Sequence, residues 1–169
     1  EDIDFSLLEK KDEFSISSYL SGLKTELQGF GFEAEVTARD KQSGPVESAF
    51  IKAPTRTHLL HVNPGPSIVE AVPSNQLLKV KVEIDTDPPK AFETEVRPVL
   101  DPIPFNVRIV SLPGLFAGKM HCVLCRQWRS RVKGRDWYDM LWFLKNEIPL
   151  QLHHLEQRMR QSGHWTESH

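Results

Sequence analysis

Acidic residues recur at every second position in two stretches of the chain, a spacing that can build a metal site. Asp2 and Asp4 stand at the start of the sequence, and Glu83, Asp85 and Asp87 alternate through a later stretch. Side chains of a β-strand alternate between its faces, so each set shares one face if both stretches are strands. Such carboxylates can hold Mg²⁺ with oxygens about 2.1 Å from the ion. A third carboxylate from a neighbouring strand would complete a two-metal site for in-line phosphoryl transfer.

The same pattern also fits a half-solvated strand of mixed charges. Lys79 and Lys81 share the face of the later acids, whereas Val82 and Ile84 point the other way, toward a core. Ile3 is expected to enter that core as well. The spacing D-x-D is common by chance, and the second acidic strand strengthens the metal interpretation.

Lys119 interrupts an otherwise apolar segment, residues 113–128, which predicts a helix that starts at a proline. A lysine in such a helix either extends along the apolar surface to water or presents a cation to a phosphate. Lys119, Cys122 and Arg126 fall on one helical stripe, so Lys119 and Arg126 could serve the same anion.

Asp136 and Asp139 lie in the first turn predicted for a helix over residues 136–146, where acids complement the helix dipole. The preceding segment, residues 129–135, is a basic loop suited to phosphate or RNA contact, or merely to solvation. Three apolar residues of this helix are expected in the core: Trp137, Leu141 and Leu144.

Composition indicates a folded chain of ordinary size. It has 169 residues, 39% hydrophobic and 26% charged, with a formal net charge of −2, which argues against clamping nucleic acid with the whole surface. Cys122 and Cys125 form a lone C-x-x-C and are read as small core residues. No signal peptide or run of about 18 apolar residues is found, so the cytoplasm is expected. Four histidines are read as structural or surface residues: His58, His61, His153 and His154.

Periodicity predicts an α+β domain with a mixed or mostly antiparallel sheet and helices gathered toward the C-terminus. Residues 63–67 predict a turn, and residues 56–62 fit a short helix or a strand. The strands are expected within residues 33–40, 46–53, 77–89 and 105–112. The helices are expected within residues 15–32, 113–128, 136–146 and 151–163.

These motifs in this order, DIDFSL, KVEID, AGKMHCVLCR and KGRDWYD, resemble the nucleotidyltransferase AbiEii/AbiGii toxin family. The resemblance runs from Asp2 to the helix that contains Leu144. It implies a polymerase-beta-like nucleotidyltransferase fold, with a mixed sheet flanked by helices and further helices at the C-terminus. It also implies a toxin of a type IV toxin–antitoxin or phage-defence system, with a cognate antitoxin.

The activity that the resemblance implies is transfer of a nucleoside monophosphate from an NTP to an acceptor, such as RNA or tRNA, with Mg²⁺ or Mn²⁺. Residue by residue, it assigns the metal to Asp2, Asp4 and Asp85, with Glu83 less certain. It makes Lys119 a nucleotide contact and Asp136 the catalytic aspartate. The predicted catalytic set is Asp136, Lys119 and Asp85, and the predicted nucleotide-binding set is Lys119, Arg126 and Asp139.

The sequence departs from the family at one place. The Gly-Gly-Ser/Thr motif that cradles the triphosphate precedes the D-x-D strand in the family, and this sequence starts after that point. We therefore expect a single domain, residues 1–169, truncated at the N-terminus and at the C-terminus as well. Two alternatives stay open: a catalytically inactive relative that binds a partner protein, and a metal-dependent nuclease or phosphohydrolase.

Overall fold

The structure is a computed structural model that describes residues 2–39, 44–55, 66–101, 103–126 and 134–165. The chain divides into two compact units, Glu1–Pro88 and Pro89–His169. We call them the N-terminal and C-terminal units, and each is described by itself. The expectation of a single truncated domain stays a prediction.

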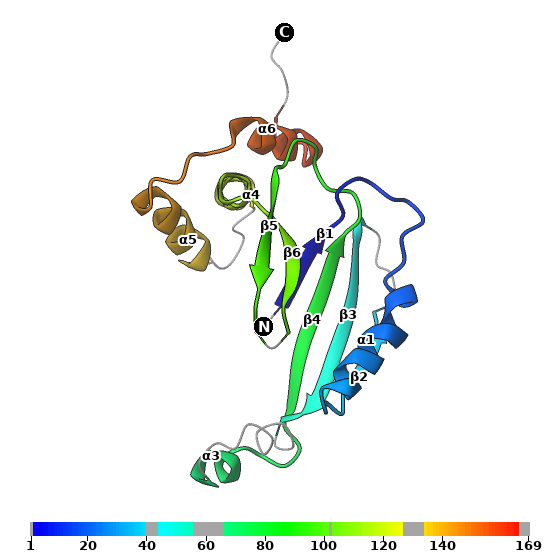
Figure 1. Cartoon of the computed structure of the whole chain (residues 1–169). Coiled ribbons are helices and arrows are strands. Elements are labelled where there is room, and N and C mark those ends of the chain that lie inside the picture. Colours follow the sequence, from blue (N-terminus) through cyan, green and yellow to red (C-terminus); the bar gives the residue numbers. More distant parts are fainter. Residues whose placement is uncertain (1, 40–43, 56–65, 102, 127–133, 166–169) are drawn as a thin grey trace. The chain divides into compact units, whose positions relative to one another are not determined.

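The N-terminal unit is built on a four-stranded mixed sheet (Figure 1). Its strand order is β1-β4-β3-β2; β1 is parallel to β4, and the other pairs are antiparallel. The strands are β1 (Asp2–Ser6), β2 (Glu35–Ala38), β3 (Val46–Pro54) and β4 (Leu77–Asp85). The mixed sheet and its helices confirm the α+β prediction, and the architecture is consistent with a nucleotidyltransferase-type fold.

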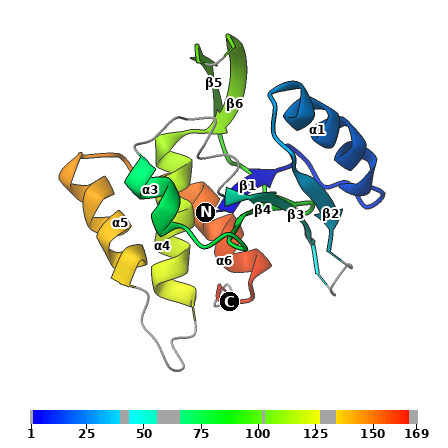
Figure 2. The same cartoon turned by 90° about the horizontal axis from the view of Figure 1, so that it is seen from below.

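One face of this sheet is apolar and is covered by α1 (Ser17–Gly29), as Figure 2 shows. Ile16, Ala49 and Val82 form the buried centre, because alternate residues of β3 and β4 point to this face. Four partly buried residues pack around them: Phe14, Leu20, Ile51 and Ile84. The alternation read from residues 77–85 therefore identifies the core face correctly.

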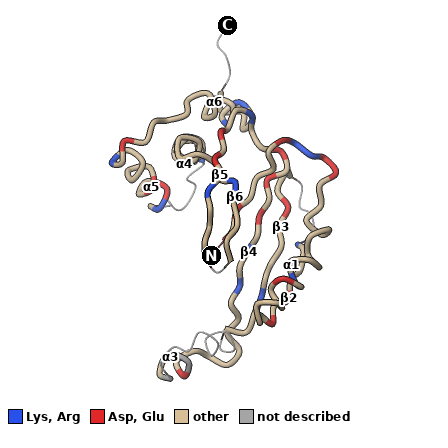
Figure 3. The backbone as a smooth tube through the Cα atoms, viewed as in Figure 1, with Lys and Arg blue, Asp and Glu red and all other residues tan. Residues whose placement is uncertain are grey.

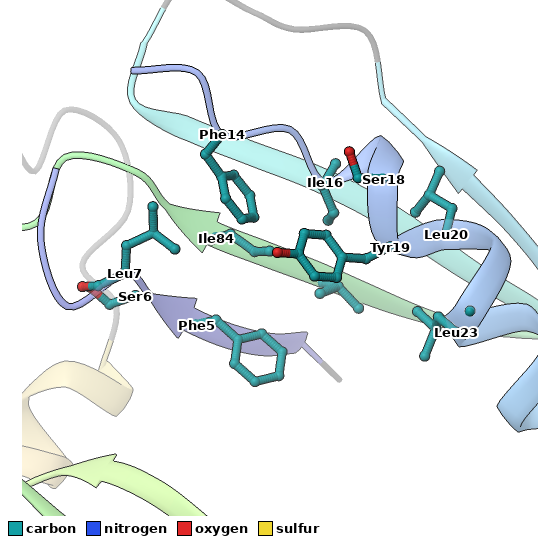
Figure 4. Close-up of a pocket in the computed structure, with 12 residues that line it drawn as sticks. Phe5, Ser6, Leu7, Phe14, Ile16, Ser18, Tyr19, Leu20, Leu23 and Ile84 are labelled. Carbon is teal, nitrogen blue, oxygen red and sulfur yellow. The ribbon is translucent and has the colours of Figure 1, made fainter. Parts of the chain in front are cut away.

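An open apolar groove of about 640 Å³ runs between α1 and the β1–β4 side of this face (Figure 4). Phe5 and Tyr19 line it, together with Phe14 of the preceding loop. Ile3 lies on the same face of β1, but its side chain is 45% exposed. The expectation that Ile3 enters the core is therefore wrong, because β1 is an edge strand and the buried cluster forms under α1 on β3 and β4.

The C-terminal unit combines an antiparallel hairpin with helices. Its elements are β5 (Thr94–Val99), β6 (Phe105–Val110), α4 (Leu112–Cys125), α5 (Gly134–Lys145) and α6 (Leu152–Gln161). Helix α4 packs between α5 and α6 (Figure 2). Phe116 of α4 stacks on Phe143 of α5 with ring centroids 5.0 Å apart, which joins these two helices.

The start of α4 is fixed by its local sequence. The Ser111 side chain accepts a hydrogen bond from the backbone N–H of Gly114, and a proline occupies the first turn. A Cβ on residue 114 would lie 2.8 Å from Val110 Cγ1, so glycine permits this close approach. Helix α6 contributes the buried His154, whose ring lies 3.3 Å from the Lys90 carbonyl oxygen. Burial is the main cause that lowers the pKa of His154 below its usual value.

Two local features of the structure differ from the expectations. Pro66 and Ser67 begin a short helix, α3 (Pro66–Ala71), instead of closing a turn. Strand β5 was not anticipated, because a proline and an arginine interrupt its alternation. Residues 56–62, with His58 and His61, and residues 129–133 lie outside the described residues. His153 is exposed and His154 is buried, as a surface residue and a structural residue would be.

The expected core residues of α5 are exposed. Trp137, Leu141 and Leu144 are 43%, 58% and 54% exposed. The reason is geometric: Asp136 and Phe143, seven positions apart, form the buried stripe of α5, and the three apolar residues follow on the neighbouring stripe.

We predict that Glu47 stabilises the N-terminal unit through the start of α1. Its buried carboxylate accepts a 2.7 Å hydrogen bond from the backbone N–H of Ile16, which precedes the helix. Glu47→Ala should lower the free energy of unfolding in urea by about 1–3 kcal/mol, because it leaves that donor unsatisfied. Glu35→Ala, on the exposed edge strand, should change it by less than about 0.5 kcal/mol. Equal losses would contradict this role.

Candidate functional site

The acidic residues of β1 and β4 share one face of the sheet, opposite α1. The parallel register pairs Asp2 with Lys81, Asp4 with Glu83 and Ser6 with Asp85. Paired residues of neighbouring strands point the same way, so these side chains form one surface, which we call the acid face. Figure 3 shows the basic residues of β4 near its start and the acidic ones toward its end.

Glu83 is the best-placed partner for the D-x-D carboxylates. It lies beside Asp4, on strands spaced about 4.8 Å apart, and is diagonal to Asp2. Asp85 is diagonal to Asp4 and one pair further from Asp2. The register thus favours Glu83, which the family resemblance makes the less certain ligand. The assignment of either Glu83 or Asp85 to the metal stays a prediction.

Several side chains already contact the β4 acids. Lys81 Nζ lies 2.6 Å from Glu83 Oε1, and the Ser48 hydroxyl donates to the same oxygen at 3.4 Å. Asp85 Oδ1 accepts the backbone N–H of Asp87 at 3.1 Å, which closes the turn after β4. Lys81 therefore supplies positive charge next to the acids, and Asp85 is partly committed to the turn.

The donor set on the acid face suits a hard divalent cation. Asp2 and Asp4 are exposed, and the side chain of Glu83 is 30% exposed. These carboxylate oxygens are the ligands that Mg²⁺ and Mn²⁺ prefer. The residues present thus fit the metal expected from the sequence.

A second charged group lies in the C-terminal unit. Asp136 is buried, with a side chain 4% exposed, and forms ion pairs with both Lys119 and Arg126. Lys119 Nζ lies 3.5 Å from Asp136 Oδ1 and 2.8 Å from Asp139 Oδ2. The structure therefore joins the predicted residues of α4 and α5 into one network.

The network fixes the charge of Lys119. Burial by itself lowers the pKa of this lysine, but the hydrogen bond to Asp139 and the charges of Asp139 and Asp136 outweigh burial and raise it. Lys119 is therefore a cation throughout the physiological range. Lys119 and Arg126 both contact the Asp136 carboxylate, so the two cations lie close together. Their roles toward a nucleotide stay predictions.

Sequence reasoning missed a third cluster, His121, Cys125 and His164, whose potential ligand atoms all lie within 4.8 Å of one another. The spacing of His121 and Cys125 on one helix was the available signal. His164 lies beyond α6, so only the packing of α6 on α4 reveals its proximity.

The fold and the acid face define the class of protein. A mixed sheet with a D-x-D strand parallel to a second acidic strand, accompanied by C-terminal helices, is consistent with a nucleotidyltransferase-type fold. A family model described as nucleotidyl transferase AbiEii toxin, type IV TA system, matches residues 1–168. The chain therefore belongs to the AbiEii nucleotidyltransferase toxin family, which confirms the resemblance.

No curated protein is similar enough to the chain to count as a match. Within the described part of the chain, no helix is both long enough and apolar enough to cross a membrane. Membership of a type IV toxin–antitoxin family implies a cognate antitoxin as a partner.

We predict that Asp136 contributes more to stability than Asp139. Asp136→Ala should lower the free energy of unfolding by about 1–3 kcal/mol, because it removes the buried carboxylate that joins Arg126 and Lys119, and Lys119 then pairs with Asp139 alone. Asp139 is one-third exposed and pairs with Lys119 at a more open position, so Asp139→Ala should cost no more than about 1 kcal/mol. Urea unfolding of both variants measures the difference. A smaller loss for Asp136→Ala than for Asp139→Ala would show that the network is not the main anchor of α5.

Proposed function

We propose that this protein transfers a nucleoside monophosphate from an NTP to a hydroxyl of an RNA acceptor, with tRNA as one candidate. The acceptor oxygen would form a bond to the α-phosphorus, and the bond between that phosphorus and the bridging oxygen would break. Pyrophosphate would leave, and the hydroxyl proton would pass to a base or to solvent. The observation that carries this proposal is the register that gathers Asp2, Asp4 and Glu83 on one exposed face.

The carboxylates of the acid face would hold the divalent metal. Asp2 and Asp4 are two of its proposed ligands, and the third comes from β4. Its register favours Glu83 in that place, with Asp85, the residue expected from the sequence, as the alternative. Mg²⁺ or Mn²⁺ in such a site supplies charge stabilisation for the attacking and leaving oxygens. Lys81, which now neutralises Glu83, would have to turn away from that carboxylate when a metal binds.

Lys119 and Arg126 would bind the phosphates of the nucleotide. Both side chains are partly exposed, at 25% and 37%. Each can therefore contact a ligand while its ion pair with Asp136 holds it in place. Asp136 is sequestered between these two cations, which supports a positioning role for it. The family resemblance implies a catalytic role for Asp136, and we keep that role as the alternative.

The biological setting follows the family. We propose a toxin-like or phage-defence role in the cytoplasm, where NTPs and tRNA are both present, under control of the cognate antitoxin. A metal-dependent nuclease would use the same carboxylates, so the products must separate the two reactions.

In the test, the purified protein, expressed from its full reading frame, is incubated with RNA, Mg²⁺ and each labelled NTP. We predict label on RNA together with an equal amount of pyrophosphate. Asp4→Asn should reduce the labelling rate at least about 100-fold, because a charge-stabilising ligand is lost. Glu35→Gln, on the same sheet face but two strands from β4, is the matched control and should label normally.

The β4 ligand is decided by a paired comparison. Glu83→Gln should reduce transfer about as much as Asp4→Asn does, and Asp85→Asn should reduce it by less than about tenfold. The reverse order would make Asp85 the third ligand. Shortened RNA without pyrophosphate would favour a nuclease, and labelling that Asp4→Asn leaves unchanged would overturn the transferase proposal.

A further inference from the structure

The cluster of His121, Cys125 and His164 lies away from the Asp136 network. His121 and Cys125 are four residues apart on α4, and His164 follows the end of α6. Each residue of an α-helix advances about 100° around the axis. The stripe of His121 and Cys125 is therefore roughly 130° away from the stripe of Lys119 and Arg126. The cluster is a separate feature of the C-terminal unit.

The ligand types of this cluster differ from those of the acid face. Two imidazole nitrogens and one thiolate sulfur are borderline-soft donors that suit Zn²⁺, whereas Mg²⁺ prefers carboxylate oxygens. Their potential ligand atoms all lie within 4.8 Å of one another. Bonds of about 2.0–2.3 Å from a central tetrahedral Zn²⁺ place ligand atoms about 3.3–3.8 Å apart, so the side chains must move together by up to about 1 Å when the metal binds.

We propose that His121, Cys125 and His164 form a zinc site that ties the segment after α6 to helix α4. A solvent molecule or another ligand would complete four-coordinate geometry. The thiol proton of Cys125 passes to solvent when the sulfur binds the metal, so binding releases a proton. The oxidation state of every atom is unchanged in this step.

Hydrogen bonds to one serine place the two imidazole rings of the cluster beside each other. Ser162 Oγ lies 2.8 Å from His121 Nε2 and 2.9 Å from His164 Nδ1, and 3.2 Å from the Met159 carbonyl oxygen. A serine hydroxyl has one proton, so it can donate to one of these three partners. The same serine thus already draws the two imidazole rings together, and their centroids are 6.3 Å apart.

A thiolate suits the charge near this cluster. Burial is the first cause that lowers the pKa of His121, and the charge of Arg158 is the second, so Arg158 supplies positive charge near this ring. If the ligands were two neutral imidazoles alone, both positive charges of the metal would stand near Arg158 without a negative charge to offset them. The Cys125 thiolate offsets one unit of the added charge, which makes the mixed N/S set more favourable than histidines alone.

The experiment titrates the reduced, metal-free protein with Co²⁺ and then with Zn²⁺. We expect Co²⁺ to give a thiolate-to-cobalt charge-transfer band in the near ultraviolet, and Zn²⁺ to abolish it by displacement. Zn²⁺ should also raise the melting temperature by several degrees, since it binds the folded state. These readouts do not depend on nucleotidyl transfer, so they stand or fall separately from the proposed function.

Matched variants locate the site. Cys125→Ser should remove the charge-transfer band, and Cys122→Ser, on the same helix but outside the cluster, should keep it. His164→Ala should weaken Zn²⁺ binding by more than about tenfold, whereas the exposed His153→Ala should leave it unchanged. His164 is exposed, so its variant tests the proposal even if Cys125→Ser does not fold. Absence of the band in the wild type, or its loss in Cys122→Ser alone, would overturn the proposal.

Discussion

Strand β4 pairs with β1 on one side and with β3 on the other, and the N-terminal unit depends on this double pairing. Its alternation gives Val82 and Ile84 to the apolar face and Glu83 and Asp85 to the acid face. A shift of one residue in the pairing would exchange the two faces. The core under α1 therefore fixes the register, and the register fixes which carboxylates are neighbours. Burial on one side of the sheet specifies the chemistry on the other.

Helix α4 has a comparable position in the C-terminal unit. It contacts α5 and α6, and it carries charged side chains on one stripe and the histidine–cysteine pair on another. Buried Asp136 holds the first stripe to α5, although replacing a buried ion pair by apolar residues is often neutral or stabilising. Stability alone therefore does not explain a buried aspartate at this point. If Lys119 and Arg126 bind phosphates as proposed, the function of the buried Asp136 is to position these two cations.

The sequence predicted the elements with strong periodicity and missed what depends on pairing between distant segments. The residues of β4, α4 and α6 followed from alternation and helical spacing. The choice between Glu83 and Asp85 required the β1–β4 register, which no local pattern contains. Trp137 was misplaced because apolar character on α5 does not by itself tell which stripe faces α4. His164 could not be linked to His121 without knowing how α6 packs.

The two candidate metal sites would select different ions by the softness of their ligands. The ligands proposed on the acid face are carboxylate oxygens, and the α4 cluster offers nitrogen and sulfur. Mg²⁺ binds imidazole and thiolate poorly, so the abundant ion would leave the α4 cluster to Zn²⁺. Exposed carboxylates without a preformed cage hold Mg²⁺ weakly and rely on nucleotide phosphates to complete its coordination. Metal on the acid face would accordingly come and go with the NTP, whereas metal on α4 would remain bound as part of the fold.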